Sequence, residues 1–231
     1  MISGEAMKPD DYINSMKAYY DHRAPWHDEY MSYSGNARME DLLRPIVDAI
    51  VPYVHGKRVL EVACGTGNWT ITLAKRAKYV LALDSSPRVL EMARTKLRMV
   101  NNVQIECADV YDLQKISPAF DVAFASDWYS HMPKSMIPRF LTGLHQNLRS
   151  GAVVIFLDMS FRNVFQNDFL CYDEEGNRVN RRKVPDGTIF DVIKNFPTEE
   201  ELRETLADWG NEFTYVTFGP LKRWMVRYRV R

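Results

Sequence analysis

The sequence has few cysteines and no net charge, and each of these absences excludes a class of protein. The three cysteines, Cys64, Cys107 and Cys171, lie far apart and match neither a disulfide framework nor a metal-ligand spacing. We therefore expect a reduced, cytoplasmic setting and no bound metal. Lysine plus arginine number 30 and aspartate plus glutamate also number 30. No overall field therefore attracts nucleic acid or an anionic membrane surface.

Long hydrophobic runs are also missing. No stretch approaches the roughly 18–20 apolar residues that span a bilayer, and residues 1–15 lack the apolar segment of a signal peptide. Internal repeats and low-complexity tracts are absent as well. We expect no membrane partner, and the 231 residues predict one domain with a sizeable core.

A turn containing two glycines is the feature around which the rest of the chain is predicted to be organised. The apolar run at 58–62 predicts a buried strand, and a helical pattern starts at about Asn68. Between them stand Gly65 and Gly67, in the strand–turn–helix order by which α/β domains present backbone N–H groups to a ligand. Asp84 ends a second apolar run, seventeen residues after Gly67, where an acidic side chain commonly binds ribose hydroxyls. The expected ligand is a cofactor that contains a nucleoside.

Strand and helix patterns alternate through the middle of the chain. We predict strands at 57–62, 79–83, 103–107, 120–126 and 152–157, and helices at 68–76, 87–98 and 133–148. Two helices at 10–24 and 39–53 precede them, and two strands at 212–218 and 222–230, joined by a tight turn, close the chain. This order indicates the α/β class, with a doubly wound, mostly parallel sheet and an N-terminal helical extension.

We therefore predict that residues 1–231 form a single domain of four consecutive parts. They are an N-terminal helical lid at 1–54, a cofactor-binding core at 55–159, a substrate-side insertion at 160–195, and a C-terminal helix and strand pair at 196–231. The insertion is polar, with turn sequences at 173–177 and 185–187. Because structureless loops of this length are uncommon in compact domains, we interpret it as a hairpin-like excursion.

The lack of a third glycine narrows the choice of cofactor. Thr70 stands where a nicotinamide or flavin site usually has a glycine, and no Gly-Lys-Ser/Thr phosphate loop is present. The run E-V-A-C-G-T-G-N-W-T, which starts at Glu61, resembles the first motif of class I S-adenosylmethionine-dependent methyltransferases. Asp84, 107–110 and 120–126 are similar to the motifs of that family's second, third and fourth strands. The resemblance covers about residues 55–231.

The resemblance implies a seven-stranded sheet of order 3-2-1-4-5-7-6, its last strand antiparallel, and S-adenosyl-L-methionine as cofactor. Glu61 would orient the amino group, Asp84 would bind the ribose hydroxyls and Asp109 would accept from the adenine amine. The implied cofactor-binding residues are Tyr19, Tyr20, Arg23, Glu61, Ala63, Gly65, Gly67, Asn68, Trp69, Asp84, Ser85, Asp109, Val110, Ser126, Asp127 and Trp128. S-adenosylmethionine carries no phosphate, so a full pyrophosphate cradle is not needed.

Simpler readings exist for several of these residues. Asp84 suits the cap of the following helix, Asp109 suits a turn, and Trp69 suits the core. The run 19–23 suits ordinary helix packing. Against that, Y-Y-D-H-R-A-P-W-H-D-E-Y at 19–30 resembles the tyrosine-bearing lid of many small-molecule members of the family.

His131 and Asp158 are the candidate catalytic residues. Each follows a predicted strand, and His131 could act as a general base for an acceptor hydroxyl or amine. A buried structural histidine is the alternative, and methyl transfer also proceeds by in-line alignment without a base. The basic run Arg178, Arg181, Arg182 and Lys183 is either a solvated face or a clamp for an anionic substrate.

The combined hypothesis is methyl transfer from S-adenosylmethionine to a small-molecule acceptor, with O-methylation as the first choice and N-methylation as the second. The stretch 181–202 resembles bacterial small-molecule enzymes, including some phosphonate O-methyltransferases. A quinone or lipid C-methyltransferase and a non-catalytic S-adenosylmethionine-binding protein are the alternatives. Balanced charge disfavours an RNA substrate. The sequence leaves monomer and homodimer open.

Overall fold

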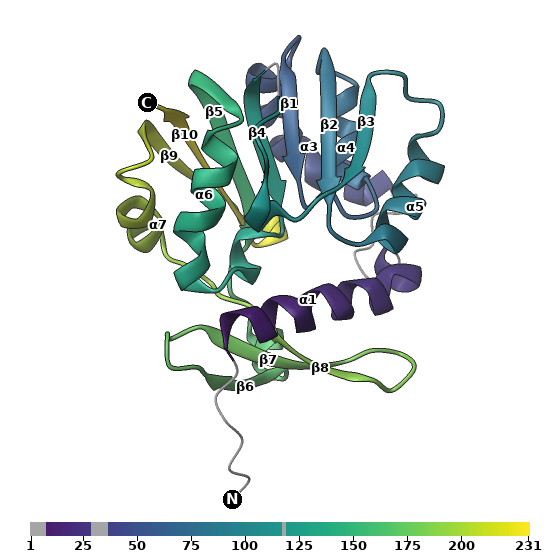
Figure 1. Ribbon diagram of the computed structural model, residues 1–231, viewed down its shortest axis with the longest axis vertical. Coiled ribbons are helices and arrows are strands. Elements are labelled where there is room, and N and C mark those ends of the chain that lie inside the picture. Colours follow the sequence, from purple (N-terminus) through teal and green to yellow (C-terminus); the bar gives the residue numbers. More distant parts are fainter. Residues whose placement is uncertain (1–7, 29–36, 117–118) are drawn as a thin grey trace, which may run out of the picture.

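The computed structural model describes residues 8–28, 37–116 and 119–231, and a seven-stranded sheet forms its centre (Figure 1). Its strands are β1 (Arg58–Val62), β2 (Tyr79–Asp84), β3 (Val103–Cys107), β4 (Phe120–Ser126), β5 (Leu148–Met159), β9 (Gly210–Phe218) and β10 (Arg223–Val230). Their order is β3-β2-β1-β4-β5-β10-β9, and β10 is antiparallel to both of its neighbours. The predicted fold class and strand order are confirmed.

Successive side chains of the central strands point to opposite faces of the sheet, so the core forms two layers, one on each face. On β1, Leu60 belongs to one buried cluster and Val59 to the other. The first cluster includes apolar residues of α6 (Ile137–His145) and α7 (Glu199–Leu206). The second includes those of α3 (Ala37–Val54), α4 (Asn68–Ala74) and α5 (Pro87–Leu97). Because both faces are covered, the strands are apolar on both sides, as a parallel sheet requires.

The helix predicted at 133–148 is shorter than expected. Regular α-helix runs only from Ile137 to His145, after the 3-10 turns η3 (Tyr129–His131) and η4 (Lys134–Met136). Leu148, predicted on the helix, instead begins β5 and pairs with Phe120 of β4. The strand continues through Gly151, whose φ of 75° lies in the left-handed region. Residues 149–151 therefore lie within the irregular start of β5.

A capping box begins α7. Thr198 accepts a hydrogen bond from the backbone N–H of Glu201, and the Glu201 carboxylate accepts one from the backbone of Thr198. This exchange satisfies two donors that a helix start leaves without partners. Leu202 and Leu206 then point into the core.

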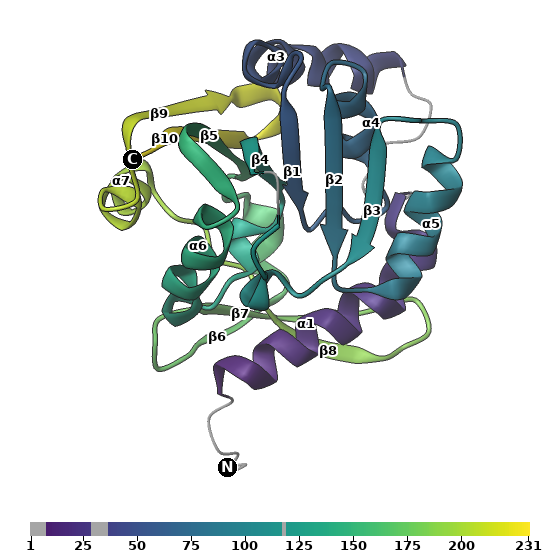
Figure 2. The same cartoon turned by 45° about the horizontal axis from the view of Figure 1, so that its top comes forward.

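Residues 160–195 contain a second sheet of three antiparallel strands. They are β6 (Phe169–Tyr172), β7 (Arg178–Lys183) and β8 (Ile189–Ile193). This sheet lies beyond the carboxyl ends of the central strands, and α1 (Pro9–Arg23) runs between the two (Figures 1 and 2). Met16 and Tyr19 of α1 pack against Val184 and Val192 of this sheet region. The division of the chain into lid, core and insertion stays a prediction, and residues 1–7 and 29–36 of the proposed lid lie outside the described residues.

Gly67 shows how closely the turn after β1 is packed. It caps α4 with φ 81°, and a Cβ on it would lie 2.9 Å from Leu97 Cδ1 and 3.4 Å from Ala93 Cβ. We expect Gly67→Ala to lower the free energy of unfolding, by about 1–2 kcal/mol for the left-handed backbone and more for the displaced Leu97. Urea unfolding measures this loss.

Gly56→Ala is the matched control, because Gly56 has φ 69° with nothing within 4 Å of its missing Cβ. Gly56→Ala should lower the free energy of unfolding only by the cost of the left-handed backbone. Equal losses in the two variants would show that packing against Leu97 contributes nothing.

Candidate functional site

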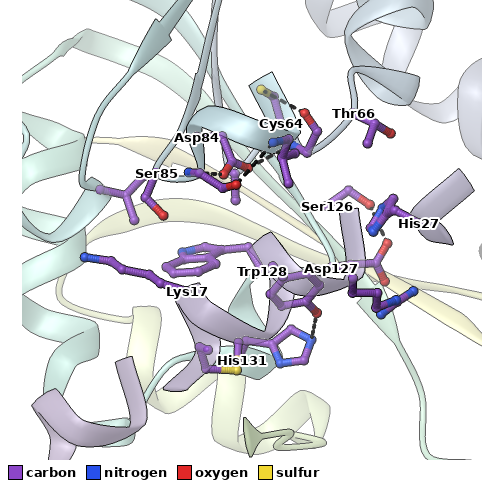
Figure 3. Close-up of a pocket in the computed structure, with 18 of the residues that line it drawn as sticks. Lys17, His27, Cys64, Thr66, Asp84, Ser85, Ser126, Asp127, Trp128 and His131 are labelled. Carbon is purple, nitrogen blue, oxygen red and sulfur yellow. Dashed lines mark hydrogen bonds between the residues drawn. The ribbon is translucent and has the colours of Figure 1, made fainter. Parts of the chain in front are cut away.

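A pocket lies between the carboxyl ends of the central strands and α1 (Figure 3). Most of the predicted site residues line it: Tyr20, Arg23, Glu61, Ala63, Gly65, Asn68, Trp69, Asp84, Ser85, Asp109, Val110, Ser126, Asp127, Trp128 and His131. They come from α1, from the turns after β1 to β4, and from η3. The parallel strands bring these distant segments together because their carboxyl ends meet at one edge of the sheet.

The turn after β1 is built for a close approach of backbone to ligand. Ala63 and Gly65 both have positive φ, 53° and 57°. The nearest atom to a Cβ built on Gly65 is His27 Nε2, at 3.9 Å across the pocket. The Gly65 N–H donates to Asp84 Oδ2 at 2.9 Å, which joins the β1 turn to the end of β2. This open face suits a ligand that rests on the backbone.

Glu61 is a buried carboxyl group on the pocket wall. Its side chain is 2% exposed, and burial raises its pKa to about 8. Among the described residues, Glu61 Oε2 has no hydrogen-bond partner. A buried acceptor of this kind calls for a cationic donor. The amino group of S-adenosylmethionine is such a donor, so the residues present fit this cofactor.

Asp84 and Asp109 combine structural hydrogen bonds with a place in the pocket. Asp84 accepts from the backbone of Gly65 and of Ser86, and burial raises its pKa. A carboxylate has about four acceptor positions, so room remains for ribose hydroxyls. The cap of α5 is Ser86, which accepts from Val89 N at 3.1 Å.

Asp109 caps the 3-10 turn η2 (Val110–Asp112) by accepting from Tyr111 N at 3.0 Å. Its second oxygen accepts from Lys17 Nζ at 2.8 Å. Burial alone would raise the pKa of Asp109, but the hydrogen bonds from Lys17 and Tyr111 N and the positive charges of Lys17 and Arg139 together lower it. The turn role and a place on the pocket wall therefore occur together.

Tyr19, predicted to contact the cofactor, does not line the pocket. Successive helical residues are separated by about 100°, so Tyr20 faces the pocket and Tyr19 faces the second sheet. Tyr19 is 4% exposed, packs against Phe190 and accepts from Arg23 Nη1 at 3.1 Å. Gly67 also lies outside the pocket wall and packs against α5 instead.

Asp158 does not face the pocket mouth, contrary to expectation. It is fully buried and accepts hydrogen bonds from Ser130 N, Ser130 Oγ, Met159 N and Lys194 Nζ, at 2.7–3.2 Å. Oδ1 accepts three of these hydrogen bonds and Oδ2 accepts one, from Ser130 N. Its position shortly after the β5 apolar run suggested a pocket residue, but the strand continues through Met159 and keeps the carboxylate inside.

His131 does line the pocket, and its tautomer is set by its neighbours. Nδ1 lies 2.6 Å from the carbonyl oxygen of Ile193, which only accepts, so Nδ1 carries the hydrogen. Nε2 therefore accepts from the Tyr20 hydroxyl at 2.9 Å (Figure 3). Burial, Lys194 and Arg182 hold the pKa of His131 well below 6.5, so the ring is neutral at pH 7.

Only one member of the basic run lines the pocket. Arg182 does, but its neighbour Arg181 points away and donates twice to Asp191, at 2.8 and 2.7 Å. Arg178 is buried with its guanidinium over the ring of Phe169. Lys183 is exposed. Neighbouring side chains on β7 point to opposite faces of the strand, so the basic run does not form a continuous clamp for an anionic substrate.

Several further residues line the pocket that the sequence patterns did not predict. They are Ile13, Met16, Lys17, His27, Cys64, Thr66, Ser86, Val89, Tyr111, Met159, Arg162, Phe165 and Lys194. A signal for some of them was present, because positions 13, 16, 17 and 20 follow the three-to-four-residue spacing of one helix face. Lys194 gave no such signal, since its place depends on the second sheet.

Asp127 is held by a contact across the sheet. Its φ is 55°, and it accepts from Arg223 Nη1 and Nη2, each at 3.0 Å. Burial alone would raise the pKa of Asp127, but the charges of Arg223 and Lys194 and the hydrogen bonds from Arg223 and Ser126 together lower it. Arg223 lies at the start of β10, far along the sequence, so this bidentate pair was not predicted.

Comparison with known proteins agrees with this geometry. A methyltransferase-domain family matches residues 59–151. A demethylmenaquinone methyltransferase of Staphylococcus aureus (strain JH9) is 26% identical over 165 residues, 67% of this chain and 68% of that protein. The solved DhpI–SAH complex is 26% identical with a TM-score of 0.75, over 96% of this chain and 98% of the other. A DhpI–SAM–HEP complex has a TM-score of 0.76 at the same identity, over 96% and 99%.

The fold and the pocket therefore define a Rossmann-like, S-adenosylmethionine-binding enzyme. The match to a methyltransferase-domain family and the similarity to the DhpI complexes support a class I S-adenosylmethionine-dependent methyltransferase. A methyltransferase of Clostridium acetobutylicum, 20% identical with a TM-score of 0.65, shares the fold over 92% of this chain and 99% of its own. Within the described ranges, no group of three or more histidine, cysteine, aspartate or glutamate side chains could hold a metal ion. None of the helices described is both long and apolar enough to cross a membrane.

Glu61 should make the stability of the ligand-free protein depend on pH. Because its folded-state pKa of about 8 lies above the ordinary 4.5, the protonated acid favours folding. That contribution is complete below pH 4.5 and is lost as the pH rises through about 8, at up to about 1.4 kcal/mol per pH unit. Glu61→Gln should flatten this decline in urea unfolding between pH 5 and pH 8.5. Glu200→Gln, on the exposed side of α7, is the control and should retain the wild-type slope; an unchanged slope in Glu61→Gln would contradict the assignment.

Proposed function

We propose that this enzyme transfers the methyl group of S-adenosylmethionine to an oxygen of a small anionic acceptor. The observation that carries this proposal is the concentration of cationic side chains on one side of the pocket. They are Arg162 after β5, Arg182 of β7 and Lys194 after β8. Arg182 and Lys194 both lower the pKa of His131, so their charges converge near that ring.

The carboxylates of the pocket lie mainly at the ends of β1, β2 and β3, where we propose that the cofactor binds. In this proposal Glu61 receives the amino group, Asp84 the ribose hydroxyls, and the Asp109 region the adenine. Ala63, Gly65, Asn68, Trp69, Ser85, Val110, Ser126, Asp127 and Trp128 form the surrounding wall. The cationic side of the pocket then remains for the acceptor.

An anionic acceptor also suits the charge change of the reaction. A new O–C bond forms as the C–S bond breaks, and its electron pair goes to sulfur, so a sulfonium and an oxyanion both become neutral. A loss of opposite charges is favoured in surroundings less polar than water, and apolar side chains such as Ile13, Met16 and Phe165 also line the pocket. Arg182, Arg162 and Lys194 would hold the acceptor in line with the methyl group, which supplies much of the catalysis.

A base role for His131 stays a prediction, and its surroundings weigh against it. Nε2 lies 3.4 Å from Lys194 Nζ, so a proton on Nε2 would be repelled by the ammonium group. An acceptor oxygen that is already ionised has no proton to lose. We propose that His131 instead positions Tyr20, whose hydroxyl it holds at 2.9 Å and whose side chain lines the pocket.

Two kinds of relative bear on the acceptor. The DhpI–SAM–HEP complex contains HEP together with SAM, and that chain matches this one over almost its whole length. The second candidate is C-methylation of a quinone, which the demethylmenaquinone methyltransferase relative favours. The cationic cluster weighs against a wholly apolar ring. N-methylation, a cytoplasmic location, and a monomer or homodimer stay predictions.

Removing a positive charge from the pocket should weaken binding of the acceptor and leave binding of the cofactor unchanged. The first step is a methyl-donor screen over small carboxylates, phosphonates, phenols, amines and quinols, in which we expect turnover with the anionic oxygen compounds. With the best acceptor, Arg182→Gln should raise KM about 10–100-fold, the effect of losing a charge-assisted hydrogen bond. The affinity for S-adenosylhomocysteine, measured by calorimetry, should change little.

Arg181→Gln is the matched control, because its side chain is bound to Asp191 outside the pocket. It should leave KM unchanged. Turnover of quinols alone, with no effect of Arg182→Gln, would replace this proposal with the quinone candidate.

His131→Asn tests the base role separately. If His131 only positions Tyr20, the variant should lose less than about tenfold in kcat, and the shape of its pH–rate profile should match wild type. Loss of a general base would lower kcat by about 10²–10⁴-fold and remove a limb of the profile. Tyr20→Phe is the companion variant, expected to lose as much as His131→Asn, with no additional loss in the double variant.

A further inference from the structure

His27 lies across the pocket from the glycine turn and has no role in the reaction as described so far. It follows α1 and the 3-10 turn η1 (Ala24–Trp26), and it lines the pocket. Its Nε2 is the nearest atom to the missing Cβ of Gly65, at 3.9 Å. Figure 3 shows Lys17 and His27 toward opposite ends of the pocket. Lys17 pairs with Asp109, on the proposed adenine side, so His27 lies on the side of the amino acid moiety.

The groups facing His27 keep its imidazole neutral. Burial and the charge of Arg23 lower its pKa to about 4, against smaller upward effects of Asp28 and Asp127 and a further lowering by Lys96. A neutral imidazole still carries one N–H donor. Beside it, Arg23 supplies a positive charge to the same pocket.

The amino acid moiety of the cofactor carries two opposite charges on one carbon. Glu61, with a buried oxygen that has no partner among the described residues, matches the ammonium. The carboxylate therefore needs donors on another wall of the turn, because burying it beside Glu61 alone would be costly. His27 and Arg23 are the donors that α1 and η1 bring to that wall. We infer that His27, together with Arg23, binds the methionine carboxylate of S-adenosylmethionine.

The residue after His27 fixes it to the same turn. Asp28 accepts from Thr66 Oγ1, from Asn68 Nδ2 at 2.9 Å and from Lys96 Nζ at 2.7 Å. Thr66 lies between the two glycines, so the backbone at His27 is tied directly to the turn on which the ligand rests. Such fixing lowers the entropy cost of using His27 as a donor.

The test compares ligands that differ only in the amino acid moiety. His27→Phe keeps an aromatic ring of similar size but has no donor, and His27→Gln restores a donor. Calorimetry with S-adenosylhomocysteine should show about 10–100-fold weaker binding for His27→Phe and partial rescue for His27→Gln. With 5′-methylthioadenosine, which lacks the amino and carboxylate groups, all three proteins should bind equally.

A decarboxylated analogue of S-adenosylhomocysteine, which retains the amine, narrows the result to the carboxylate and should also bind equally to all three. Equal weakening of every ligand in His27→Phe would show a purely structural role and overturn the inference, as would unchanged binding of S-adenosylhomocysteine. Thermal unfolding of both variants checks that they fold. Binding of S-adenosylhomocysteine to wild type is independent of the acceptor, so failure of this inference is distinct from failure of the proposed function.

Discussion

The hydrogen bond from the Gly65 N–H to the Asp84 carboxylate is the contact on which the arrangement of the pocket depends. It joins the turn after β1 to the end of β2, and it holds Gly65 with positive φ and its open side toward the pocket. Ser86, which donates its N–H to Asp84, begins α5 and also donates its hydroxyl to Asp21 of α1. One carboxylate thus links two strands, the start of one helix and, through Ser86, the helix that covers the pocket.

The pocket separates charge in a way that fits two different ligands. Its strand-end side offers carboxylates, several of them already engaged with backbone N–H groups, while the side formed by the second sheet offers guanidinium and ammonium groups. A cofactor with an ammonium and a sulfonium belongs near the first, and an anion belongs near the second. The sheet, α1 and the second sheet together produce this separation, since no single segment carries both kinds of charge.

The sequence predicted the central sheet well because local signals and the fold agree there. Apolar runs such as 120–126 form strands with the expected bounds, and the motif around Gly65 lies at the expected strand end. Prediction was weaker for the site residues, because the direction of each side chain decides whether it faces the pocket. Tyr19 and Tyr20 differ by one helical step, and Asp158 turns inward only because β5 runs on to Met159. Lys194 and Arg223 reach Asp158 and Asp127 through contacts far apart in the chain, which no local pattern reveals.

Helix α1 has two working faces, one toward the pocket and one toward the second sheet. Lys17 and Tyr20 belong to the first, whereas Tyr12 and Tyr19 pack against the second. Inserting or deleting a single residue in this helix would rotate everything beyond it by about 100° and exchange the faces. The turn between β7 and β8 has no such constraint, since its Gly187 is exposed. Among related chains, length should therefore vary freely at that turn and hardly at all within α1.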